Sequence, residues 1–117
     1  MEHTFRPPWY HRNTMSEFMG NVAGKYDAKE AGFVPGASSL HSTMTPHGPE
    51  KEVFEKASTM ELKPMFVSAG GLAFMFETCF LLKITKYAAD NEHIDVDYYK
   101  CWEGISNNFS DAIKKQK

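Results

Sequence analysis

The sequence predicts a mainly β fold with two helical segments, and three observations lead to that prediction. Within residues 72–86, apolar side chains fall on alternate positions, which is typical of a strand with one apolar face. Residues 1–49 are rich in Gly, Pro, His and Met and only weakly periodic, a pattern typical of short strands joined by ordered loops. Helical patterns are confined to residues 49–58 and to the last part of the chain.

The first half of the chain is expected to contain short strands, and residues 33–36 are typical of a strand that ends in a turn. Residues 49–58 are expected to form one short helix. Pro49 suits its first turn, where a backbone N–H is not needed. Glu50 and Glu52 follow near the positive end of the helix dipole, which favours negative charge.

The clearest strand pattern lies in residues 72–86, which are expected to form one long bent strand or two strands. Its apolar face is made by the even-numbered residues Leu72, Phe74, Phe76, Phe80, Leu82 and Ile84. The end of the chain is expected to form an amphipathic helix, because apolar residues recur there at helical spacing. These residues are Tyr98, Trp102, Ile105 and Phe109, with Asp95 or Asp97 as the expected cap. Taken by itself, this helix is interpreted as a packing element without chemistry.

Composition and charge exclude several classes of protein. The chain has 117 residues, 42% of them apolar and 24% charged, as in one ordinary folded domain. With a net charge of −2 and no basic patch among its aromatics, nucleic acid is not an expected partner. The most apolar stretch, residues 71–82, is too short for a bilayer, so no membrane association is expected. The N-terminus lacks the apolar core of a signal peptide. Cys79 and Cys101 fit reduced thiols, so a cytoplasmic location is expected.

Histidines are the main candidates for chemistry. Any one of the five is best interpreted as structural or as a surface residue, and His3 and His93 show nothing more. His11, Glu17 and His47 are of interest as a set, because two imidazoles and one carboxylate form the facial triad of non-haem Fe(II) oxygenases. The same residue types also bind Zn²⁺, so they do not choose the metal by themselves.

The spacing between His11 and Glu17 sets a condition on the backbone. On a straight strand the two side chains would lie on the order of 20 Å apart, and on a helix they would point in different directions. The backbone must therefore bend between them, and Asn13, Thr14 and Ser16 are residues that support such bends through side chain to backbone hydrogen bonds. Residues 38–49 form a polar segment with two histidines and two prolines. It is either a rigid loop that presents ligands or an ordinary surface loop.

Several longer strings closely resemble homogentisate 1,2-dioxygenases. They are FRPPWYHRN (5–13), MSEFMG (15–20), GFVPG (32–36), SLHSTMTPHGP (39–49), FEKAS (54–58), AFMFE (73–77) and KCWE (100–103). The strings are colinear and cover nearly the whole chain. This resemblance implies a partial cupin, or jelly-roll β-barrel, with iron inside it. It also implies ring opening of homogentisate by dioxygen to maleylacetoacetate, in tyrosine and phenylalanine breakdown.

The resemblance also implies roles for individual residues. His11, Glu17 and His47 match the Fe(II) ligands of the family. Tyr26 matches a substrate-binding tyrosine, His47 also lies against the substrate, and His41 matches a second histidine near it. Without the resemblance, Tyr26 would be interpreted as a packing or surface residue. No acid–base catalyst is assigned, because the histidine with that role in the family lies upstream of the matched strings.

Members of the family are several-fold longer, so residues 1–117 are expected to be the C-terminal part of a catalytic cupin domain, in a truncated form. The expected partners are homogentisate, dioxygen, and either further copies of the chain or the remaining part of the enzyme. Half a barrel would expose strand edges and the apolar even-numbered face of residues 72–84, so the isolated chain is expected to be poorly stable or to associate. Two alternatives remain: a catalytically silent chain that keeps a metal site, and a small zinc-binding protein.

Overall fold

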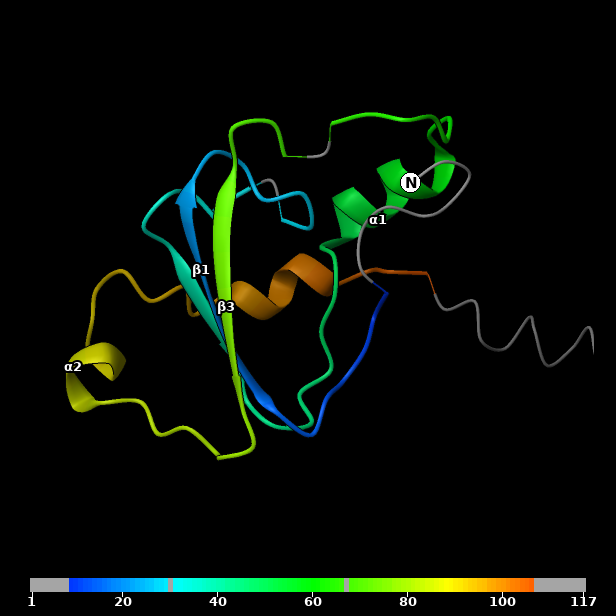
Figure 1. The fold of residues 1–117 in the computed structure, drawn as a ribbon. Coiled ribbons are helices and arrows are strands. Elements are labelled where there is room, and N and C mark those ends of the chain that lie inside the picture. The colour runs from blue at the N-terminus through cyan, green and yellow to red at the C-terminus, as the bar shows by residue number, and fades with distance from the viewer. Residues whose placement is uncertain (1–8, 30, 67, 107–117) are drawn as a thin grey trace, which may run out of the picture.

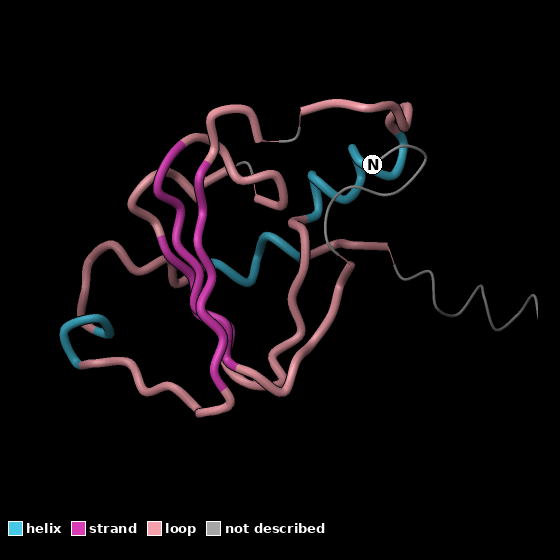
Figure 2. The backbone as a smooth tube through the Cα atoms, in the orientation of Figure 1, coloured by secondary structure: helices cyan, strands magenta, loops and turns pink. Residues whose placement is uncertain are grey.

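A computed structural model describes residues 9–29, 31–66 and 68–106, and its centre is a three-stranded antiparallel sheet (Figure 1). The strands are β1 (Ser16–Ala23), β2 (Ser38–His41) and β3 (Leu72–Thr78), and β1 lies in the middle. Figure 2 shows the three strands side by side, with long loops at both ends. The prediction of a mainly β fold is confirmed. The sheet is consistent with part of a cupin, and within the described residues it does not close into a barrel.

Strand register separates the sheet into two chemically different faces. Glu17 pairs with His41 on one side and with Glu77 on the other, while Phe18 pairs with Phe76. Because side chains alternate along a strand, the odd-numbered residues share one face and the even-numbered residues share the other. The odd-numbered face carries the candidate site. It includes Glu17, Met19, Ser39, His41 and Met75, all of which line one pocket.

Asn21 organises the turn region beyond β1. Its buried side-chain amide donates hydrogen bonds to the carbonyl oxygens of Gly24 (3.0 Å) and Phe33 (2.7 Å). The Phe33 carbonyl is thus bound by a side chain and not by a strand ladder, so the strand expected at residues 33–36 is absent. The turn expected there is present: Ala37 N–H donates to the Val34 carbonyl, and Gly36 takes a φ of 91° that favours glycine.

The helix predicted for residues 49–58 is confirmed as α1 (Lys51–Thr59). It begins after the fully buried Pro49, and it buries Val53 and Ala57. The Glu50 N–H donates to the Ala28 carbonyl at 3.1 Å, which ties the start of α1 to the loop after β1. Ala28 and Phe33 complete the small buried apolar core.

The long strand predicted for residues 72–86 is only half correct, because β3 ends at Thr78. The Thr78 hydroxyl accepts a hydrogen bond from the Phe80 N–H at 3.3 Å, a local turn that competes with the strand ladder. The chain then leaves the sheet, and Thr85 caps the one-turn helix α2 (Lys86–Ala89) with its side chain. Figure 1 shows this excursion extending away from the sheet before the chain returns to it.

Of the amphipathic helix predicted at the end of the chain, the structure shows a short 3₁₀ helix, η1 (Tyr98–Trp102), and Ile105 lies beyond its end. Asp97 is its cap residue but makes no side-chain cap hydrogen bond, whereas the Asp95 carboxylate accepts from the Asp97 N–H at 3.1 Å. The helix ends because Gly104 turns the backbone to a φ of 75°. Phe109, placed on this helix by the sequence, lies outside the described residues.

The even-numbered side chains of β3 are exposed to solvent, with Phe76 68% and Leu72 60% exposed. Phe80 and Ile84, which lie beyond the end of β3, are exposed to a similar degree. This agrees with the expectation that the apolar face lacks an opposing layer. Among the described residues, no helix has the length and apolarity needed to span a bilayer.

Candidate metal centre

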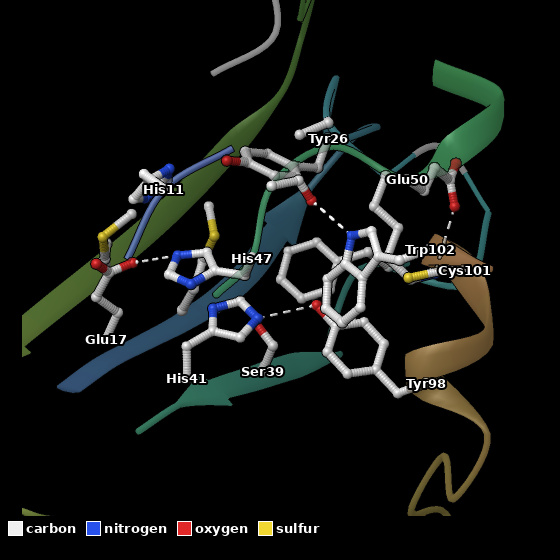
Figure 3. Close-up of a pocket in the computed structure, with 16 residues that line it drawn as sticks. His11, Glu17, Tyr26, Ser39, His41, His47, Glu50, Tyr98, Cys101 and Trp102 are labelled. Atoms are coloured by element: carbon white, nitrogen blue, oxygen red, sulfur yellow. Dashed lines mark hydrogen bonds and ion pairs between the residues drawn. The ribbon is translucent and has the colours of Figure 1, made fainter. Parts of the chain in front are cut away.

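His11, Glu17 and His47 come together although they are far apart in sequence. The backbones of His11 and His47 bridge the two segments by a pair of hydrogen bonds, both 2.9 Å long. Glu17 projects from β1 toward the same point (Figure 3). Ligand-capable atoms of the three residues all lie within 4.8 Å of one another. The tertiary structure therefore assembles the three residues that the sequence singled out.

The bend required between His11 and Glu17 is made by Asn13. Its side-chain oxygen accepts from the Met15 N–H at 3.0 Å, which closes a local turn. Its amide nitrogen donates to Glu17 Oε1 at 3.2 Å. Asn13 thus both bends the chain and orients the carboxylate, while Ser16, also expected to support the bend, instead donates to the Phe80 carbonyl.

Backbone carbonyls orient the two imidazoles. Nδ1–H of His11 donates to the Trp9 carbonyl, and Nδ1–H of His47 donates to the Thr45 carbonyl at 2.9 Å. Each of these bonds commits Nδ1 to carrying the proton. A hydrogen bond on one ring nitrogen sets which nitrogen is available to a metal, so Nε2 is the nitrogen left available in both residues.

The donor set fits a bound cation. With Nδ1–H of His47 committed to Thr45, Nε2 of that ring still faces Glu17 Oε2 at 2.9 Å. An imidazole nitrogen and a carboxylate oxygen attract each other only when a proton or a metal ion lies between them. Glu17 is only 4% exposed, and a buried carboxylate requires such compensation. Two imidazoles and one carboxylate match the facial triad.

His41 lies against His47 without belonging to the triad. The two rings are stacked, with centroids 3.9 Å apart and an interplanar angle of 11°. Burial, together with the neighbouring His47, lowers the pKa of His41 to about 4, so the ring is neutral at pH 7. The phenol oxygen of Tyr98 lies 3.1 Å from Nε2 of His41.

Tyr26 reaches the pocket from the loop after β1, on the side opposite Tyr98 (Figure 3). Its ring packs against that of Phe33, with centroids 5.5 Å apart. Burial raises the pKa of Tyr26 above its usual value of 10, so its hydroxyl remains a hydrogen-bond donor at neutral pH. The pocket has a volume of about 150 Å³, and the three triad residues, Tyr26 and His41 all line it.

Several residues that line the pocket were not predicted from the sequence. Tyr98, Cys101 and Trp102 of η1 line the pocket, and so do Met19 and Met75 of the sheet. The two methionines could have been found, because they share odd parity with Glu17 along paired strands. No pattern in the sequence points to the η1 residues. His93 is exposed, as expected, and His3 lies outside the described residues.

Comparison with known proteins agrees with the resemblance that the sequence strings carry. A family model described as homogentisate 1,2-dioxygenase C-terminal matches residues 1–109. A homogentisate 1,2-dioxygenase of Rhizobium etli is 59% identical over 92% of the chain. Those of Sinorhizobium medicae and Nitrobacter hamburgensis are 57% and 56% identical over the same share. The chain spans 24% of the length of each of these relatives.

Proposed function

Because this chain belongs to the homogentisate 1,2-dioxygenase C-terminal family, we propose that it forms the Fe(II)-binding part of a dioxygenase site. The site would open the ring of homogentisate with dioxygen to give maleylacetoacetate. Residues 1–117 would then be the C-terminal part of a catalytic cupin domain.

One observation carries this proposal: the ligand atoms of His11, Glu17 and His47 lie within 4.8 Å of one another. His11, Glu17 and His47 would hold Fe(II), and the bound iron would supply the redox chemistry of dioxygen activation. The near-complete burial of Glu17 supports the assignment, because a bound metal would compensate the charge of its carboxylate.

The remaining pocket residues would bind and orient the substrate. The Tyr26 hydroxyl would donate a hydrogen bond to an oxygen of homogentisate, because its raised pKa keeps the hydroxyl protonated. His41, kept neutral by its lowered pKa, would lie beside the substrate without adding positive charge next to the metal. Rings on both sides of the pocket would limit the access of water.

We further propose that the rest of the enzyme, or another copy of this chain, completes the barrel. The exposed even-numbered side chains of β3 and the 24% share of the relatives' length support this step. Cys79 and Cys101 are both free thiols, which supports the proposed cytoplasmic location.

A second candidate function is a chain that binds metal without turning over substrate. The three-stranded sheet favours it, because within the described residues the sheet does not close into a barrel, and an incomplete barrel would admit the water that dioxygen chemistry must exclude. The two candidates share a metal site and differ only in catalysis.

The test is to add Fe(II) anaerobically to the chain and measure bound iron, then oxygen uptake with homogentisate. His11→Ala, Glu17→Ala and His47→Ala are the test variants, and His93→Ala is the matched control, because His93 is exposed and outside the pocket. Stoichiometric iron with homogentisate-dependent uptake, lost in the three variants alone, supports the dioxygenase. Iron without uptake supports the second candidate. No more iron than in the variants contradicts both.

A further inference from the structure

The 3₁₀ helix η1 makes two polar contacts with the histidine-bearing segment 41–48, and both involve aromatic side chains. The Tyr98 phenol oxygen lies 3.1 Å from Nε2 of His41. The Trp102 indole N–H donates to the carbonyl oxygen of Gly48 at 3.0 Å. Figure 3 shows both contacts on the side of the pocket away from Glu17.

The two contacts act on different parts of His47. Tyr98 contacts His41, whose ring is stacked on the His47 ring with centroids 3.9 Å apart. Trp102 holds the backbone of Gly48, the residue next to His47 in the chain. The ring and the backbone of one triad residue are thus each restrained from η1.

Gly48 is held at its carbonyl oxygen by Trp102 and lies close to Tyr10 at its Cα. A Cβ atom at Gly48 would lie 2.4 Å from a ring carbon of Tyr10 and 3.0 Å from the Tyr10 backbone, so Tyr10 lies close against it. Only glycine permits so close an approach. The Tyr98 and Trp102 rings also support each other edge to face, with centroids 5.0 Å apart.

We propose that Tyr98 and Trp102 are positioning residues that hold His47 in the geometry needed by the metal. This inference rests on the proposed function, since it assigns a role around the same triad. Groups that orient metal ligands from outside change metal affinity when they are removed, although they touch no metal themselves. The C-terminal segment is then part of the site and not only a packing element.

The experiment compares Tyr98→Phe and Trp102→Phe in the full chain with Tyr99→Phe. Tyr99 is the matched control because it lies on the same helix and is 57% exposed. Co(II) is the probe, since its absorption reports the number and arrangement of its ligands. We expect each test variant to bind Co(II) about 10-fold more weakly and to change its absorption bands, as removal of an orienting partner does. Tyr99→Phe should match the original chain in both.

A second readout needs no metal. In ¹⁵N spectra of the metal-free chain, the His47 imidazole signals should shift or broaden in both test variants and stay unchanged in Tyr99→Phe. Circular dichroism establishes that each variant is folded. If Trp102→Phe does not fold, Tyr98→Phe decides the question.

Three outcomes separate the two proposals. Weaker Co(II) binding with altered His47 signals supports the positioning role. Binding and signals equal to those of Tyr99→Phe overturn it and leave the metal site intact. If the original chain binds Co(II) no better than His47→Ala, the proposed function fails. The positioning role is then judged on the metal-free spectra, where unchanged His47 signals overturn it.

Discussion

At the scale of single residues, the site depends on polar side chains that hold ligands in place, and Asn13 is the clearest example. It closes a turn through its oxygen and donates to Glu17 through its nitrogen. We expect Asn13→Ala to weaken Co(II) binding about 10-fold, because Glu17 loses its orienting partner. Asn91→Ala is the control: Asn91 makes the same turn, with the His93 N–H, far from the site. A Co(II) titration measures the affinities. Equal Co(II) affinities in Asn13→Ala and Asn91→Ala would contradict this role of Asn13.

The neutral state of His41 has a consequence for stability against pH. Its pKa is 6.5 in an unfolded chain and about 4 in the fold, so the unfolded state binds more protons between these values. The free energy of unfolding of the metal-free chain should therefore fall as the pH falls from 6.5 to 4. Above pH 6.5 this effect is absent.

Urea unfolding at pH 4.5 and pH 7.5, in metal-free His41→Gln and His93→Gln, checks this expectation. The loss of stability at the lower pH should be smaller in His41→Gln than in the original chain. His93→Gln should retain the full loss, because His93 is exposed. A loss in His41→Gln as large as that in the original chain would show that His41 is not the group responsible.

At the scale of elements, the close approach of β1 and β3 depends on glycine. Gly24 follows β1 with a φ of 68°, and a Cβ there would lie 2.8 Å from the Gly71 backbone, just before β3. Gly36 also has a positive φ, of 91°, but nothing lies within 4 Å of the position of its Cβ. Because the backbone is left-handed at both positions, alanine would cost about 1 kcal/mol of stability at either one.

Gly24→Ala should lower the free energy of unfolding more than Gly36→Ala does. The expected difference is about 1–3 kcal/mol, because the ends of β1 and β3 must move apart to admit the Cβ. Chemical denaturation of the two variants beside the original chain measures the difference. Equal losses would mean that the contact between Gly24 and Gly71 does not restrain the sheet.

At the scale of the whole molecule, the open apolar face makes association the expected behaviour. Phe76 lies on the edge strand β3 and is 68% exposed. We expect Phe76→Lys to shift the chain toward the monomer, because a charge on an edge strand opposes pairing with another chain. Tyr87→Lys is the control, since Tyr87 is 83% exposed on α2, away from the sheet.

Sedimentation velocity over a range of concentrations measures this association. Self-association that Phe76→Lys reduces and Tyr87→Lys leaves unchanged would locate the contact on the sheet. A monomeric original chain with a single cooperative melting transition would contradict the expectation that the chain is unstable alone.

The sequence by itself determined the features that depend on local chemistry. Alternation predicted the strand that begins at Leu72, and Pro49 with its acidic neighbours predicted α1. The strings around His11 and His47 identified the family that the comparisons then showed. Strand periodicity and helix signals act between near neighbours, so they can be recognised in one sequence without knowledge of the fold.

Only the tertiary structure decided which distant residues meet. The end of β3 at Thr78 results from a side-chain turn that competes with the ladder, which periodicity does not reveal. The contacts of Tyr98 and Trp102 with the histidine segment join residues 57 and 54 positions apart. Such contacts depend on how loops return to the sheet. The same helical spacing of Tyr98 and Trp102 would suit a packing helix anywhere, so no local pattern distinguishes the two roles.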